Sequence, residues 1–254
     1  MGRWVSNFNT TAELQAFSGT TAFSQPHVSL TKDDGKVHFF DPCKSIIVNT
    51  TYDWVEIGGV KWATKNVGAL TVTDYGQYFQ WGDTQGFTAD QVSGNCHSKT
   101  FVWADYKYCS GAGTSSSAIT KYNSTDGKTV LDLSDDAARV NMGGLWRMPT
   151  TAEFQALGTA TTSAWTTDYQ GSGVSGLVLT DKTDSSKVLF FPAAGRCRNG
   201  SVSYVGSRGN YWSSSVSSSN VQFADFLYFD SSGVYWQRSS YRYYGFAVRG
   251  VLGE

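Results

Sequence analysis

Hydrophobic and polar positions alternate over short distances along this chain, and the first clear alternation predicts a hairpin near the N-terminus. In HVSLTKDDGKVHFF (residues 27–40), two alternating runs flank Asp34 and Gly35, a dipeptide that tolerates the positive φ angles of a two-residue hairpin turn. The preceding TTAELQAFSG (10–19) has the start and stop signals of a short helix. Residues 1–50 are therefore predicted to form a small N-terminal module of one short helix plus a hairpin. A disordered leader followed by one extra hairpin fits the same pattern.

Residues 51–191 contain several short strand-like runs separated by turn residues. VEIGGVKWATKNVG (55–68) is predicted to form a strand, a turn and a second strand. SGLVLTDKTDSSKVLFFPAAG (175–195) is predicted to form a hairpin that runs into a turn, and GAGTSSSAITKYNSTDG (111–127) a long polar loop. Many short strands between turn signals favour antiparallel sheets over a helical bundle.

Two segments have the capping pattern of short helices. In LDLSDDAARVNMGG, Ser134 is the predicted N-cap, and the glycine pair at the end stops the helix. In MPTTAEFQALG, Thr150 or Thr151 caps a second helix, Glu153 completes a capping box with Thr150, and Gly158 ends it.

The C-terminal strands separate two sets of side chains. In VYWQ, strict alternation puts Val234 and Trp236 on one face and Tyr235 and Gln237 on the other. DFLYF (225–229) has the same two-sided pattern. We therefore expect one set to build a scaffold and the other, which includes the tyrosines, to project. A polar-faced sheet in which tyrosine is frequent because it favours strands is the alternative.

The composition of residues 192–254 strengthens the case for projecting tyrosines. The last lysine is Lys187, whereas six of the nine arginines follow it and seven of the fourteen tyrosines lie between positions 204 and 244. Tyrosine, serine, glycine, asparagine and arginine together are typical of antibody binding loops, where tyrosine gives contact area at low entropic cost. The segment therefore indicates a binding surface.

The bulk properties exclude some partners. The chain has 254 residues and a formal net charge of −1, without the basic excess that nucleic-acid binding needs. No apolar run reaches the length of a membrane helix, and MGRWVSNFNTTAELQ at the start lacks the apolar core of a signal peptide. We expect no nucleic-acid partner, no membrane insertion and no visible secretory signal.

No motif for metal binding or catalysis is present. The cysteines match no zinc spacing; Cys96 and Cys109 could pair in an oxidising compartment, but thiols are the prediction for a chain without an export signal. The histidines lie in no metal frame, no GxSxG occurs, and the EPN, QPD and WND triplets of calcium-dependent lectins are absent. The carboxylate pair Asp135 and Asp136 fits a helix start. The prediction is a protein that is not an enzyme, without a cofactor or metal.

Several motifs resemble known families. GGVKWATKNVG, YGQYFQWGDT and LWRMPTTAEFQAL resemble a domain abundant in Bacteroidetes and their phages, the major paralogous domain. WRMPTTAEF and GFAVRG also resemble signatures of the formylglycine-generating-enzyme branch of the C-type lectin fold. FPAAG…NG…VGSRGNYWSSSV…FADFLYFDSSGVYW…YRYYGFAVR is similar to the variable region of diversity-generating-retroelement target proteins from gut bacteria and phages. The resemblance covers roughly residues 54–251. The N-terminal module resembles a short module of Bacteroides phage proteins.

The resemblance implies a fold and a set of site residues. The fold would be α+β and C-type-lectin-like, of the formylglycine-generating-enzyme subtype, with short twisted antiparallel strands and about two helices. It would occupy residues 51–254, with a variable region at 192–250 in which an error-prone reverse transcriptase rewrites adenines. The implied ligand-binding positions are Arg196, Cys197, Arg198, Ser203, Tyr204, Arg208, Asn210, Gln222, Phe223, Asp225, Phe226, Tyr228, Tyr235, Gln237, Arg238, Ser240, Tyr241, Tyr243 and Tyr244.

The implied function is binding. By resemblance, the chain is a phage receptor-binding or adhesin protein, on a virion tail or tail fibre or at a cell surface, that recognises a bacterial surface protein or glycan. Its N-terminal module would allow homo-oligomer formation or virion attachment. An oxidase role fails because oxidase members need a cysteine pair in the C-terminal half, and only Cys197 lies there. The alternatives are a bacterial cell-surface domain that binds glycan or protein without diversification and, third, a glycan-acting enzyme.

Overall fold

A small sheet forms near the N-terminus of the computed structural model, which describes residues 3–8, 31–33, 36–41, 52–94, 96, 98–111 and 118–253. Strands β1 (Arg3–Phe8), β3 (Lys36–Asp41) and β2 (Thr31–Asp33) pair antiparallel in the order β1-β3-β2. The register Asp33 to Lys36 confirms the predicted hairpin, whereas β1 was not predicted. The helix predicted over 10–19 lies outside the described residues.

The second sheet joins segments from both ends of the main body. It has the order β4 (Trp54–Ile57), β5 (Val60–Asn66), β15 (Arg249–Leu252) and β6 (Trp146–Arg147). Positive φ angles at Gly58 and Gly59 make the predicted turn between β4 and β5. Arg249 is fully buried and donates to Asn66 and to the carbonyl oxygens of Ala63 and Phe190. The sheet therefore closes around a buried cation.

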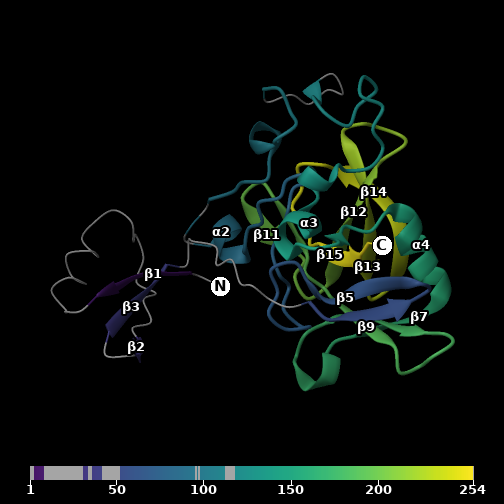
Figure 1. Ribbon diagram of the computed structural model, residues 1–254, viewed down its shortest axis with the longest axis horizontal. Helices are drawn as coiled ribbons and strands as arrows, with labels where there is room; N and C mark the ends of the chain where they lie inside the picture. The colour runs from purple at the N-terminus through teal and green to yellow at the C-terminus, as the bar shows by residue number, and fades with distance from the viewer. Residues whose placement is uncertain are drawn as a thin grey trace.

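The remaining sheets come from consecutive segments. The predicted hairpin over 175–195 is confirmed as β8 (Gly176–Asp181) and β9 (Val188–Pro192), which β7 (Thr161–Thr166) extends to a three-stranded sheet. The small pair β10 (Arg196–Arg198) and β11 (Ser201–Ser203) follows. A sheet with the order β12 (Arg208–Val216), β13 (Phe223–Asp230) and β14 (Gly233–Tyr241) then completes the set. Figure 1 shows β14, in yellow, beside the helix α4.

Three short α-helices lie in the described part of the chain: α2 (Ala89–Ser93), α3 (Ala137–Met142) and α4 (Thr151–Ala160). The N-cap of α4 is Thr150, whose side chain accepts from the backbone N–H of Glu153, as predicted. The helix continues past Gly158 to Ala160, so the predicted end is wrong. Gly158 serves packing instead, because a Cβ there would overlap the ring of Trp236.

The start of α3 also differs from the prediction. Its N-cap is Asp136 rather than Ser134, since residues 133–135 form a 3-10 turn. The Asp136 carboxylate accepts from the backbone N–H groups of Arg139 at 2.9 Å and Met148 at 2.7 Å. The carboxylate therefore both caps the helix and ties it to the start of the next segment.

Two hydrophobic cores flank the central strand β13. Leu227 and Phe229 belong to one buried cluster, whereas Phe226 and Tyr228 on the opposite face belong to the other. A strand buried on both faces cannot project either set of side chains into solvent. The architecture is thus α+β, with mostly antiparallel sheets and few helices, and the coarse part of the predicted fold class is confirmed.

Candidate binding face

The structure divides the predicted ligand-binding positions by exposure. Exposed or half-buried positions on β10–β14 and their turns are Arg196, Arg198, Ser203, Tyr204, Arg208, Phe223, Tyr235, Gln237, Arg238, Ser240 and Tyr241. The remaining positions are buried: Cys197, Asn210, Gln222, Asp225, Phe226, Tyr228, Tyr243 and Tyr244. The expected projection of the tyrosines is therefore wrong for Tyr228, Tyr243 and Tyr244. A role for the buried positions in binding stays a prediction.

Arginines and tyrosines stack on one another at the β10–β12 end of this surface. The guanidinium of Arg208 lies 3.9 Å from the ring centroid of Tyr204, and that of Arg196 lies 5.2 Å from it. Arg196 and Arg198 both lie over Tyr244, at 5.4 and 5.2 Å. These residues come from two strands and two turns, so folding assembles the cluster from separate segments.

A β-bulge sets which residues share the second cluster. Across β13 and β14, Phe226 pairs with Arg238 and Tyr228 with Tyr235, with an irregularity between them. Arg238 therefore joins Tyr235 on one face and lies 4.3 Å from its ring centroid and 4.9 Å from that of Tyr228. Strict alternation had placed Gln237 beside Tyr235, and this prediction is wrong because the extra residue reverses the order.

The opposite face of β14 supports the sheet. Gln237 donates to Asp225 at 2.8 Å and interacts with Gln155 of α4 at 2.9 Å. Asp225, only 3% exposed, also accepts from Ser239 at 2.6 Å and from Thr151 at 3.3 Å. Each donor lowers the cost of burying this carboxylate. Asp225 and Gln237 thus hold the sheet to α4, on the side away from Tyr235.

A cluster of aromatic residues forms the third part of the surface. Tyr241 and Tyr243 stack with ring centroids 5.6 Å apart, and Trp103 lies 4.8 Å from Tyr243. Phe223 meets Tyr241 edge-on at 4.7 Å. Burial raises the pKa of Tyr243 to about 12. Trp103 was not among the predicted site residues, because nothing local in its sequence indicates contact with a strand so distant along the chain.

The clusters form one continuous face. Tyr228 joins them: its hydroxyl donates to Asp230, whose backbone lies opposite that of Arg208 in the register of β12 and β13. Tyr244 lies 5.9 Å from Tyr241 and so connects the Arg196 cluster to the aromatic group. We call the accessible part the arginine–tyrosine face, made of Arg196, Arg198, Tyr204, Arg208, Tyr235, Arg238 and Tyr241.

A buried arginine anchors the turn at 241–244 from below. Arg242 is fully buried, lies 4.7 Å from the Trp81 ring and donates to the carbonyl oxygens of Lys121 at 3.0 Å and Tyr122 at 2.7 Å. Burial lowers its pKa, because the charged form loses its hydration. The turn that carries Tyr241 is therefore tied to the segment at 119–123.

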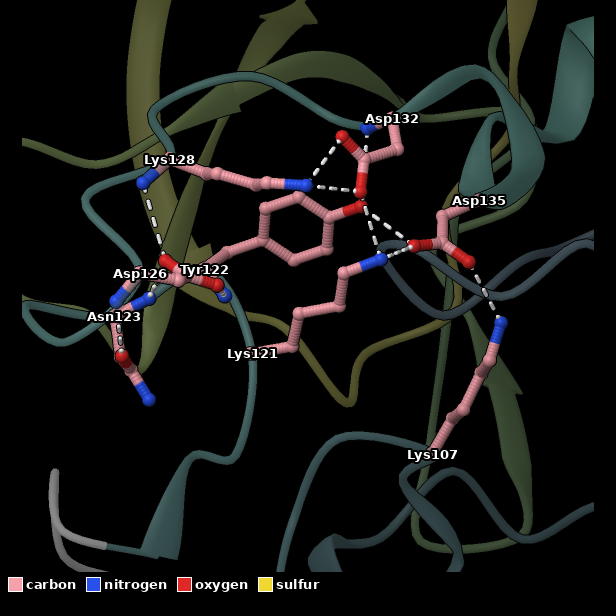
Figure 2. A network of polar contacts seen from close by, with 8 residues as sticks. All are labelled: Lys107, Lys121, Tyr122, Asn123, Asp126, Lys128, Asp132 and Asp135. Atoms are coloured by element: carbon pink, nitrogen blue, oxygen red, sulfur yellow. Dashed lines mark hydrogen bonds and ion pairs between the residues drawn. The ribbon is translucent and has the colours of Figure 1, made fainter.

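That segment is itself held by a carboxylate network. Figure 2 shows Asp135 between Lys107 on one side and Lys121 with Tyr122 on the other. The oxygens of Asp135 accept from Lys107 at 3.0 Å and from Lys121 and the Tyr122 hydroxyl at 2.5 Å each. Burial opposes ionisation, yet the hydrogen bonds from these groups and Tyr108 hold the pKa of Asp135 well below 3.8. Lys121 also pairs with Asp132, which extends the network.

The described cysteines differ in burial and in bonding. Cys197 is fully buried, and burial raises the pKa of its thiol. Its backbone exchanges hydrogen bonds with Gly245, where a Cβ would overlap the Phe101 ring. Cys96 is disulfide-bonded, whereas Cys109 and Cys197 are thiols. The prediction that Cys96 is a free thiol is therefore wrong. The alternative disulfide between Cys96 and Cys109 does not form either, because Cys109 is a thiol.

Two hollows lie apart from the face. One, of about 410 Å³, is lined by Asp74, Tyr75 and Asp90, and the other, of about 720 Å³, lies beside Asn123 and Asn220. Within the described ranges, no group of three or more histidine, cysteine or acidic side chains could hold a metal ion. No helix in that part of the chain has the length and apolar character to cross a membrane.

Comparisons of this chain with protein-family models, with curated proteins and with solved structures find no match.

Proposed function

We propose that this chain is a ligand-binding protein that recognises a bacterial surface ligand through the arginine–tyrosine face, as a phage receptor-binding or adhesin protein does. The observation that carries this proposal is the gathering of exposed tyrosine and arginine from separate segments around a sheet whose central strand, β13, is buried on both faces. Exposed tyrosine and arginine are enriched where proteins bind their partners. A rigid support reduces the entropy lost on binding.

The fold behind this face is proposed to be C-type-lectin-like, of the formylglycine-generating-enzyme subtype. Two motifs that carry the resemblance have clear physical roles here. In WRMPTTAEF, Arg147 pairs with both carboxylate oxygens of Glu153 at 2.8 and 2.5 Å, which joins β6 to the start of α4. In GFAVRG, Phe246 and Val248 are buried and Arg249 closes the sheet. These roles support the proposal.

Diversification by a retroelement is part of the same proposal. It would act on the positions at 192–250, and a virion or cell-surface location would follow. The fixed residues around them, such as Trp212 and Phe246, stack at 4.1 Å and support the sheet from within. A scaffold of this kind tolerates exchange at exposed positions, because surface substitutions change stability little.

The direct test replaces exposed side chains of the face. We expect the variant Y204A/Y235A/R238A/Y241A to lose binding to a panel of intact gut bacterial strains, measured by flow cytometry of the labelled protein. Its Tm should fall by only a few degrees, because these side chains are exposed. Tyr243 is excluded from the set since it is buried.

A matched variant with exposed apolar residues removed elsewhere, L133A/V140A, serves as the control. It should bind cells as the parent chain does. If the parent chain binds strains in the panel and the face variant binds them equally well, the face is not the binding site and the proposal fails. A parent chain that binds no strain also counts against it.

A further inference from the structure

The exposed charge of residues 192–253 is mostly positive, because the acidic side chains there are the buried Asp225 and the half-buried Asp230. Of the arginines after Lys187, Arg242 and Arg249 are fully buried, and the others are Arg196, Arg198, Arg208 and Arg238 on the arginine–tyrosine face. A chain with a formal net charge of −1 thus carries a local positive surface. Such a surface attracts ligands of the opposite charge.

The acids of the same strands form no ion pair with these arginines, although the charge of Arg208 is among the causes that lower the pKa of Asp230. Asp225 is buried toward α4 and accepts from neutral donors. Asp230 accepts from the hydroxyls of Ser232 and Tyr228, and these bonds lower its pKa to about 2. No ion pair joins a carboxylate to the four guanidiniums of the face within the residues that the structure describes. Their charge is therefore available to a ligand.

Contact with tyrosine rings positions the guanidiniums of Arg208 and Arg238. The guanidinium of Arg208 lies 3.9 Å from the ring centroid of Tyr204, and that of Arg238 lies 4.3 Å from the ring centroid of Tyr235. Such contact restrains the side chain, while the N–H groups stay able to form the paired bonds that match a carboxylate. The cost of ordering these side chains is thus met before a ligand arrives.

The extent of the face suits an extended ligand. Its residues come from successive strands and turns between Arg196 and Tyr241, so a ligand that contacts them all would lie across several strands. Protein partners usually need an apolar interface centre, whereas here guanidiniums lie close to the rings of the exposed Tyr204 and Tyr235. The guanidiniums and phenol hydroxyls of the face suit repeated carboxylates and hydroxyls.

We propose that the arginine–tyrosine face binds an acidic polysaccharide through the carboxylates of its sugar units. This inference rests on the proposed function, because it names the ligand chemistry of the same face. Arg196 and Arg208, which share Tyr204, form one carboxylate site, and Arg238 beside Tyr235 forms a second.

The test measures binding of the full chain to polygalacturonate by biolayer interferometry. Fully methyl-esterified polygalacturonate is the matched probe, since it has the same sugars without the charges. We expect binding to polygalacturonate only, and a loss of about tenfold or more in affinity for R196Q/R208Q. The pair K182Q/K187Q, which removes the same charge on the turn between β8 and β9, should leave affinity unchanged. R198Q/R238Q provides a second variant if the first is unstable.

Several outcomes would overturn the inference: equal binding to the esterified probe, no binding to polygalacturonate or alginate, or full affinity in both arginine variants. Preference for dextran sulfate, polyglutamate or duplex DNA would also overturn it. The cell-binding assay separates the two proposals. If the parent chain binds cells through the face but ignores the acidic polysaccharides, the ligand chemistry is wrong and the proposed function stands. If alanine substitutions on the face leave cell binding intact, the proposed function fails.

Discussion

The arginine side chains of residues 192–254 lie in two different environments, because some are buried and the others are accessible. Arg242 and Arg249 are fully buried, lie over Trp81 and Phe191, and direct their N–H groups to carbonyl and amide oxygens. Burial lowers the pKa of Arg249 to about 10, so it stays charged at neutral pH. Composition alone cannot separate these anchors from the exposed arginines, because the partners of the buried ones lie far away in the sequence.

Gly158 gives a prediction at the same scale. Alanine normally stabilises a helix interior relative to glycine, but here a Cβ would overlap the Trp236 ring. We expect Gly158→Ala to destabilise the protein by about 1–3 kcal/mol, measured by urea unfolding.

Gly233 is the matched site for this experiment, because a Cβ there meets no atom within 4 Å and its φ is not positive. Gly233→Ala should change the free energy of unfolding little. A neutral or stabilising G158A would mean that Trp236 does not pack against α4 in solution.

At the scale of elements, features that depend on residues close together in the sequence could be predicted. Features that depend on contacts between distant segments could not. The capping box of α4 involves Thr150 and Glu153, three residues apart, so the sequence alone located it. The bulge in β14 depends on pairing with β13, and it moved Gln237 to the α4 side. The burial of Tyr243 depends on Trp103, which no periodicity indicates. The residue types of the exposed face could thus be predicted from the composition of the segment. Which residues belong to the face could be determined only from the fold.

The network around Asp135 gives a prediction for one loop. Asp135 is 5% exposed and accepts from two lysines and a tyrosine. Removing its charge leaves those donors without their partner, so we expect Asp135→Asn to cost about 3 kcal/mol at pH 7. Because its pKa is lowered in the folded state, the ionised carboxylate stabilises the fold above its ordinary pKa. That stabilisation is lost as the pH falls below about 4.

Thermal unfolding from pH 7 to pH 2 measures both effects. The Tm difference between the parent chain and D135N should shrink at the acid end. Asp53→Asn, at an exposed position, should show little Tm difference at pH 7. A D135N variant as stable as the parent at pH 7 would contradict the role assigned to this network.

At the scale of the whole molecule, the face and the scaffold occupy the same strands. β13 contributes to both hydrophobic cores, while β14 carries Tyr235 and Arg238 on its accessible side. An exchangeable face of this kind needs a support whose stability does not depend on the exchanged residues. The support here includes Trp212 and Phe246, which contact each other beneath the face.

The proposed diversification predicts a pattern of variation across this region. Deep sequencing of codons 192–250 in the source population should show substitutions at the predicted positions, at adenines of a nearby template copy. Exposed positions such as Tyr235 and Arg238 should vary more widely than buried ones such as Asp225 and Phe226, because buried exchanges destabilise the fold. Invariant codons would exclude diversification and would leave a fixed binding face for one ligand.

The pairing of β5 with β15 also determines the order in which the molecule can be completed. Arg249 bonds to Asn66 across 183 positions of sequence, so ribosomal synthesis releases β5 long before its partner strand exists. Contacts between such distant segments form slowly. Although β4 pairs with one edge of β5, the edge that waits for β15 is open to association with other chains. Every segment of the arginine–tyrosine face emerges within that interval. The nascent chain must therefore stay unaggregated with its strands incomplete until β15 arrives.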